Sequence, residues 1–142
     1  MKTRVIDVVE VRVFVDRDKD GEIYEQLVSQ ASKNAEDYPF ATKKDLFMVA
    51  ACLGAKHNRF EELAPKNRKE VFRGSTFDNK TDVPVLAALA YQKEKDVKIL
   101  SDPKKIVEIA QGWANGGIHM VRDELLGQPG RPLYNLVNML LD

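Results

Sequence analysis

The sequence has little cysteine and no net charge. Its 142 residues include one cysteine, Cys52, which excludes a disulfide within the chain and a zinc site built from paired cysteines. With 22 basic and 22 acidic side chains, the formal net charge is zero, and this disfavours a protein that coats nucleic acid by bulk charge. Because Cys52 stands in an apolar run, we predict that it is a small core residue and not a nucleophile.

Long hydrophobic runs are also missing. The longest wholly apolar run, residues 46–53, is far shorter than the ~20 residues that a membrane-spanning helix needs. Asp7 and Glu10 interrupt the N-terminal stretch, which therefore lacks the apolar core of a signal peptide. We expect a cytoplasmic protein with no membrane partner. An apolar fraction of 44% and a length of 142 residues are typical of one globular domain.

Apolar residues recur at helical spacing through most of the chain, and this predicts a mainly α, compact helical domain. We expect helices over residues 22–32, 43–53, 83–91 and 102–126, and a C-terminal helical tail within 128–142.

Capping residues suggest where these helices begin and end. Thr42 and Asp45 form a capping-box-like pair, Asp82 precedes a second apolar segment, and Asp102 is followed by proline. Gly54 is predicted to be a left-handed C-terminal cap. The sequence Asn115-Gly116-Gly117 is predicted to stop the helix that starts after Asp102, with a second helix after it.

The N-terminal part has a different period. Val9, Val11, Val13 and Val15 fall on one face at a spacing of two, so residues 5–15 predict a β-strand within the first 16 residues. A lone strand leaves backbone groups without partners. The strand could pair with a short segment at 70–72 or 97–100, or with another chain. Alternatively, residues 5–15 could form a helix.

No motif for catalysis stands out, and we predict no catalytic, metal or cofactor site. Asp16, Asp18 and Asp20, followed by Gly21, match the first half of a calcium-binding EF-hand loop, but Leu27 stands where the bidentate glutamate belongs. We interpret these residues as a charged turn that caps the following helix. A metal-dependent enzyme that uses this acidic loop is kept as an alternative.

The two histidines, His57 and His119, lack metal-ligand neighbours at a recognised spacing. The sequence also contains no nucleophile elbow, no P-loop and no dinucleotide-binding glycine motif.

Residues 56–80 are polar and locally basic, with seven basic and four acidic side chains. Such a stretch can contact phosphates or an acidic protein surface. It can equally be a solvated loop with a short helix near 66–72. The candidate residues for binding nucleic acid or a partner are Lys56, His57, Asn58, Arg59, Lys66, Arg68, Lys69 and Arg73.

The C-terminal tail is a second candidate surface. Leu133, Leu136, Val137 and Leu140 form an apolar face after a break rich in proline and glycine. This helix is too short to be stable alone. It either folds back on the core or docks on a neighbouring subunit, which would make the protein a homo-oligomer.

Three stretches together resemble a known family: residues 39–54, which contain the Lys44 to Gly54 segment, residues 82–91, and residues 106–117 with their Trp113-Ala114-Asn115-Gly116-Gly117 ending. The chain is similar over about residues 38–126 to the small Dnd-system-associated proteins, whose genes neighbour bacterial DNA phosphorothioation and restriction genes. The matching residues are mainly helix cores and glycines.

The resemblance implies a non-enzymatic accessory protein of a bacterial DNA-modification or phage-defence system. Its expected partners are protein components of that system, DNA, or both. Two other classes stay open from the residues alone: the metal-dependent enzyme described above, and a structural protein that self-assembles through residues 5–15 or through the C-terminal helix.

Overall fold

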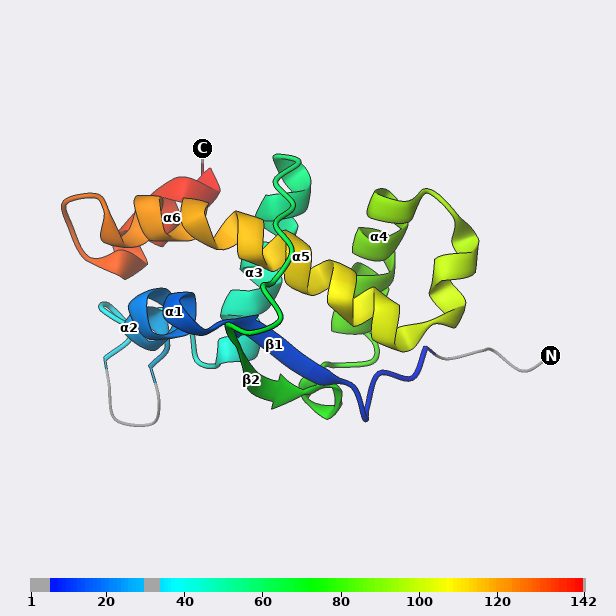
Figure 1. The fold of residues 1–142 in the computed structure, drawn as a ribbon. Coiled ribbons are helices and arrows are strands. Elements are labelled where there is room, and N and C mark those ends of the chain that lie inside the picture. The colour runs from blue at the N-terminus through cyan, green and yellow to red at the C-terminus, as the bar shows by residue number, and fades with distance from the viewer. Residues whose placement is uncertain (1–5, 30–33, 142) are drawn as a thin grey trace.

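The computed structural model describes residues 6–29 and 34–141, and helices dominate them (Figure 1). The long helices are α3 (Lys43–Lys56), α4 (Asp82–Glu94) and α5 (Pro103–Val121), and α6 (Pro132–Leu141) is the C-terminal helix. A small two-stranded sheet lies near the N-terminus. The predicted mainly α fold with an N-terminal strand is confirmed.

The centre of the fold is the crossing of α3 and α5, where two glycines let the backbones touch (Figure 1). A Cβ atom on Gly54 would lie 2.0 Å from the carbonyl oxygen of Trp113. On the facing helix, a Cβ atom on Gly117 would lie 1.8 Å from the carbonyl oxygen of Ala50. Real contacts are never this short, so both positions require glycine for the approach of the two helices.

This packing explains why two predicted helix ends are wrong. α3 does not end at Gly54 but continues to Lys56, and α5 runs through Asn115-Gly116-Gly117 without a break as far as Val121. All three residues are buried. The glycines serve close packing in the helix interior, and the cost of glycine there, roughly 0.5–1 kcal/mol relative to alanine, is offset by the contact they permit.

Two of the predicted helix starts are confirmed. The Thr42 hydroxyl accepts a hydrogen bond of 3.2 Å from the Asp45 N–H, and the Asp102 carboxylate accepts one of 3.1 Å from the Lys105 N–H. The third is wrong: Asp82 is the first residue of α4 and not its cap. Its carboxylate instead accepts a hydrogen bond of 2.8 Å from the Asp78 N–H.

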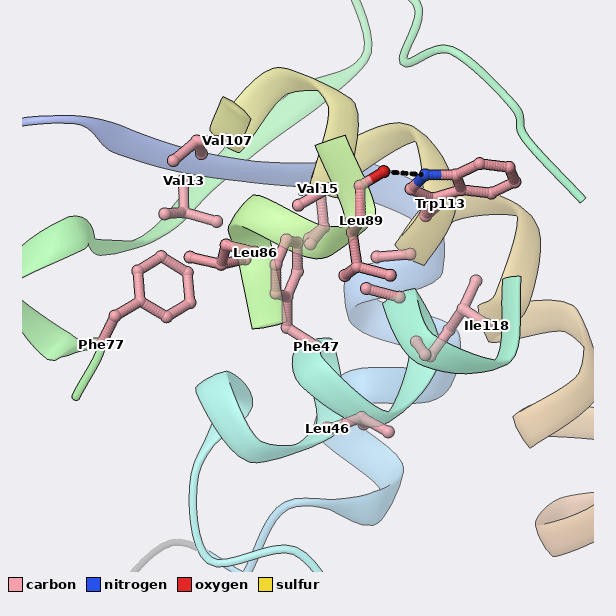
Figure 2. Close-up of a cluster of buried hydrophobic side chains, with 14 of the residues drawn as sticks. Val13, Val15, Leu46, Phe47, Phe77, Leu86, Leu89, Val107, Trp113 and Ile118 are labelled. Carbon is pink, nitrogen blue, oxygen red and sulfur yellow. Dashed lines mark hydrogen bonds between the residues drawn. The ribbon is translucent and has the colours of Figure 1, made fainter. Parts of the chain in front are cut away.

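Apolar side chains from α3, α4, α5 and β1 meet in one core (Figure 2). The largest buried side chain is that of Trp113, whose indole N–H donates a 3.0 Å hydrogen bond to the carbonyl oxygen of Leu89. The predicted burial of Cys52 is wrong, since its side chain is exposed. The neighbouring Ala51 and Gly54 take the buried side of α3.

The N-terminal strand is shorter than predicted and has an internal partner. β1 (Arg12–Asp16) pairs antiparallel with β2 (Arg68–Arg73), which contains the predicted 70–72 segment. Val13 and Val15 are buried, but Val9 lies in a turn and is 42% exposed. The strand prediction for 6–11 and the short helix predicted at 66–72 are therefore wrong, and residue 5 lies outside the described residues.

The other candidate strand, at 97–100, is part of a 3₁₀ helix, η3 (Val97–Ser101). A second one, η2 (Gly74–Thr76), follows β2 directly.

The first helical stretch begins earlier than predicted. It runs through α1 (Arg17–Lys19), the π-helical η1 (Asp20–Tyr24) and α2 (Glu25–Leu27) without a gap. The Asp16 carboxylate caps it by accepting a hydrogen bond of 3.0 Å from the Lys19 N–H. The predicted turn at 16–21 is thus mostly helix. The predicted helix at 28–29 is wrong, since α2 ends at Leu27 and Val28 is extended, and residues 30–32 lie outside the described residues.

The C-terminal helix α6 follows a second π-helical turn, η4 (Arg122–Leu126). It folds back on the body of the protein, where Leu136 and Met139 pack against the core. The Leu133 N–H donates a hydrogen bond of 2.9 Å to the carbonyl oxygen of Glu36, which fixes the start of the helix.

We predict that Gly117→Ala destabilises the protein by about 1–3 kcal/mol or more, because the new methyl group overlaps the Ala50 carbonyl. Urea denaturation measures the loss. Gly21→Ala is the matched control, since a Cβ atom added to Gly21 would meet nothing within 4 Å. Equal stability of the two variants would show that α3 and α5 do not depend on this contact.

Candidate binding surface

The eight predicted contact residues are all exposed, but they form two separate groups. Lys56, His57, Asn58 and Arg59 lie at the C-terminal end of α3, whereas the other four lie in or next to β2. Figure 1 shows the segment between α3 and β2 crossing α5, with one group at each of its ends. The sequence places these residues in one stretch, and the fold separates them.

The first group is set by how α3 ends. His57 is the C-terminal cap, and its N–H donates a 3.1 Å hydrogen bond to the Leu53 carbonyl. Asn58 follows in the left-handed region with a φ of 53°, a conformation that asparagine tolerates better than most residues. The chain then turns so that the Arg59 backbone lies against Gly116 on α5, leaving the Arg59 side chain exposed.

The second group divides between the two faces of β2. Lys69 is opposite the buried Val15, and its ammonium group reaches Asp20 at 3.0 Å. Arg68 is opposite Asp16 on the other face, where its guanidinium carbon lies 4.6 Å from the centre of the Phe14 ring. Strand alternation therefore makes Lys69 a structural residue and leaves Arg68 on the surface.

Ion pairs reduce the basic character of this stretch further. Arg73 pairs with Glu10 at 3.7 Å, in addition to the pair between Lys69 and Asp20. Lys69 and Arg73 are thus the two of the eight predicted residues that pair with carboxylates in the described part of the chain. The remaining cations, Lys56, Arg59, Lys66 and Arg68, are divided between the two groups.

The acidic segment near residue 20 forms a buried ion-pair cluster. Asp20 is 1% exposed, and its two carboxylate oxygens accept hydrogen bonds from Lys43 at 2.9 Å and from Lys69 at 3.0 Å. Lys43 also reaches Glu25 at 2.7 Å. Partial burial lowers the pKa of Lys43, but its hydrogen bonds and charge interactions with Asp20 and Glu25 outweigh burial and raise the pKa above its ordinary value.

This cluster explains the acidic pattern without a bound cation. Asp16 caps the first helix, Asp18 accepts a 3.0 Å hydrogen bond from Asn67, and Asp20 points inward to two lysines. Within residues 6–29 and 34–141, no three histidine, cysteine, aspartate or glutamate side chains are grouped so that they could hold a metal ion.

A second polar network was not predicted from the sequence. The Lys19 ammonium group donates to the Asn115 side-chain oxygen at 2.7 Å and lies 3.3 Å from Glu61. The other Glu61 oxygen lies 3.0 Å from His119. Partial burial raises the pKa of Glu61, but His119 and Lys19 outweigh it and lower the pKa below its ordinary value. The network ties three segments together that are far apart in sequence.

A groove lies between β1 and the first half of α5 and encloses about 500 Å³. Its β1 wall includes Val11, Arg12 and Phe14, and its α5 wall includes Lys104, Val107, Glu108 and Gln111. A smaller hollow of about 270 Å³ shares Arg68, Glu108 and Gln111 with it. Of the predicted contact residues, Arg68 is the one that lines this groove. The other lining residues were not predicted because helix α5 and the N-terminal strand meet only in the fold.

The outer face of α6 is the main exposed apolar surface of the described chain. Tyr134, Val137, Leu140 and Leu141 are 54%, 45%, 68% and 80% exposed. Their spacing of three, four and seven residues places them along one stripe of the helix. The helix contains no charged residue. Large exposed apolar side chains gathered on one face are typical of protein-binding surfaces.

These features define a small helical protein with an exposed apolar face on α6 and a groove between β1 and α5. Residues 12–142 match the family described as DNA sulphur modification system-associated protein 4, and the chain belongs to that family. The resemblance to Dnd-system-associated proteins is thereby confirmed. No curated protein and no solved structure matches the chain. Among the helices in the described ranges, none has the length and apolar character needed to cross a membrane.

The buried Asp20 gives a prediction about stability. Asp20→Asn should destabilise the protein by about 2–3 kcal/mol, because an amide cannot accept both charged hydrogen bonds. Asp18→Asn is the control. Because the Asp18 carboxylate is exposed, this substitution should lower the free energy of unfolding by less than about 0.5 kcal/mol. Thermal and urea unfolding compare them. If both variants were equally stable, Asp20 would not be a structural anchor.

Proposed function

We propose that this chain is a non-enzymatic accessory protein of a DNA sulphur modification system, and that it binds a protein component of that system. The family match over residues 12–142 supports the association with the system. The outer face of α6 is the observation that carries the protein-binding part, because it exposes four large apolar side chains on a helix without charge. Such an accessory protein acts in the cytoplasm, where DNA is modified.

The exposed basic residues form the second part of the proposal. Lys56, Arg59 and Lys66 are exposed at the α3 end and on the segment that leads to β2. They are proposed to contact acidic groups of the bound partner at the edge of the interface, where charged side chains mainly guide association. DNA is the second candidate for these residues, and the group formed by Lys56, His57, Asn58 and Arg59 is the observation that favours it.

Co-purification tests whether the chain binds a protein partner. We expect the full-length chain, expressed from its native host with the neighbouring system genes, to co-purify with a component of the DNA sulphur modification system. Val137→Asp combined with Leu140→Asp should reduce the recovered partner by at least about tenfold, because charges would be buried in an apolar interface. The exposed polar control Asn79→Asp should retain it, since Asn79 lies on the segment before α4 and not on α6.

Co-purification at an unchanged level with the double variant would contradict the role of α6. Recovery of no component of the system from the native host would contradict the protein-binding function itself. Circular dichroism of the variants checks that the helical content is unchanged, which is expected because Val137 and Leu140 are exposed.

Binding to a short DNA duplex distinguishes a protein partner from DNA. Because the net charge is zero and the exposed cations are divided into two groups, we expect only weak binding to a short duplex, which disappears at physiological salt. Fluorescence anisotropy over a salt series measures it. Tight binding with a steep salt dependence, lost on replacing Lys56 and Arg59 by glutamate, would instead favour DNA as the partner.

A further inference from the structure

Within residues 6–29 and 34–141, one edge of the strand β1 has no pairing strand, and the backbone of this edge faces the groove. The sheet contains two strands, so β2 covers only one edge of β1. The Val11 carbonyl accepts a 2.7 Å hydrogen bond from the Gly74 N–H on the β2 side. Backbone direction alternates along a strand, so the N–H and C=O of Arg12 point away from β2.

A hydrogen bond from Phe14 confirms which element this edge faces. Phe14 stands two residues after Arg12 and therefore points its backbone to the same side. Its N–H donates a 2.9 Å hydrogen bond to the side-chain oxygen of Gln111 on α5. The irregularity of the ladder between Val13 and Phe14 leaves this alternation intact, because the extra residue belongs to β2. Gln111 thus closes one end of the edge, and Arg12 remains on the open part.

The groove of about 500 Å³ runs along this open edge. Val11, Arg12 and Phe14 form one wall, and α5 forms the other with Lys104, Val107, Glu108 and Gln111. A volume of this size lies within the range of pockets that hold ligands. A partner that enters here meets a donor and an acceptor from the same strand residue, which is the pattern that an extended peptide matches when it adds to a sheet.

The charges on the walls indicate the kind of peptide. Arg12 pairs with Glu70, and Glu10 pairs with Arg73, so these four side chains largely neutralise one another. Arg68, Lys104 and Glu108 remain, and they give the groove one excess positive charge. Arg68 is held over the Phe14 ring at the mouth of the groove, which fixes a cation beside the open edge.

We propose that the groove between β1 and α5 binds an extended, acidic peptide segment of a partner protein, which pairs as an added strand with the backbone of Arg12. This inference rests on the proposed partner-binding function and specifies how the partner is held. A nucleic acid strand has no donor and acceptor pattern that matches the edge of a sheet. The peptide therefore uses the free edge of β1, which an isolated pair of strands would otherwise expose to solvent.

Selection from a library of displayed random 12-residue peptides against the full-length chain tests the proposal. We expect the selected peptides to be acidic and rich in β-forming residues. Fluorescence anisotropy with one selected peptide then measures affinity. Arg12→Pro should weaken binding by about tenfold or more, because proline has no N–H to donate. Arg12→Ala is the matched control, since it loses the same charge as Arg12→Pro but keeps the N–H, and it should bind several-fold more tightly than Arg12→Pro.

Charge reversal tests whether the positive charge of the groove contributes to binding the acidic peptide. Lys104→Glu should weaken binding of the acidic peptide and reduce its salt dependence, whereas Lys80→Glu, on the exposed segment before α4, should not. Failure to enrich any peptide, or selected peptides that bind Arg12→Pro as tightly as the original chain, would overturn the proposal.

Hydrogen exchange measured by NMR on the original chain tests the pairing at Arg12 even if Arg12→Pro fails to fold. In the free protein the Arg12 amide should exchange quickly, and the amides of Val13 and Val15, which belong to the paired strand, slowly. The selected peptide should slow exchange at Arg12. An Arg12 amide that is already protected, or that exchanges at the same rate with the peptide bound, would overturn the proposal.

Other outcomes identify a different occupant. Displacement of the peptide by a 12-nucleotide oligothymidine would assign the groove to nucleic acid, and peptide-sensitive dimers in light scattering would assign it to a second copy of the chain. Either result overturns the proposal. If Arg12→Pro co-purified with the system component at the same level as the original chain, the role of the groove would be overturned but the proposed function would stand. If the original chain co-purified with no system component, the proposed function would be contradicted, and peptide binding to the groove could still be measured.

Discussion

The close approach of α3 and α5 is the contact on which the rest of this structure depends. Gly54 and Gly117 allow each helix backbone to touch the other, and a single added methyl group at either position would overlap a carbonyl oxygen. The same stretch of α5 supports the segment after α3, since Gly116 lies under the Arg59 backbone and Gly112 under the Phe60 ring. Helix α5 therefore fixes the path of the chain from α3 to β2, and with it the position of the sheet.

Polar networks attach the N-terminal segments to this helical centre. Asp20 joins the first helical stretch to α3 through Lys43 and to β2 through Lys69, and Lys19 joins the same stretch to α5 through Asn115. The cost of burying the Asp20 charge is offset by charged hydrogen-bond donors on both of its carboxylate oxygens. An acidic pattern that suggests a cation site in the sequence is thus explained by two lysines that arrive from distant positions.

The surfaces that remain for function lie away from this centre. The apolar stripe of α6 is held outward because Leu136 and Met139 occupy its inner side, and the free edge of β1 faces α5 across a groove. Both features carry the proposed contacts with a protein partner, and the family to which the chain belongs is named for its association with DNA sulphur modification systems. The basic residues that were expected to form one patch are divided by the fold, and two of them are neutralised by carboxylates.

The sequence by itself determined the features that depend on neighbours along the chain. Helical periodicity, the caps at Thr42 and Asp102, the alternation of Val13 and Val15, and the apolar face of α6 are local, and each is present in the structure. Only the tertiary structure decided the roles of Gly54, Asn115 and Asp20, and the meeting of Arg12 with α5. The physical reason is that a glycine after an apolar run suits both a helix end and a helix crossing, and a carboxylate suits both water and a buried lysine. Which of these it meets depends on residues that are distant in the sequence.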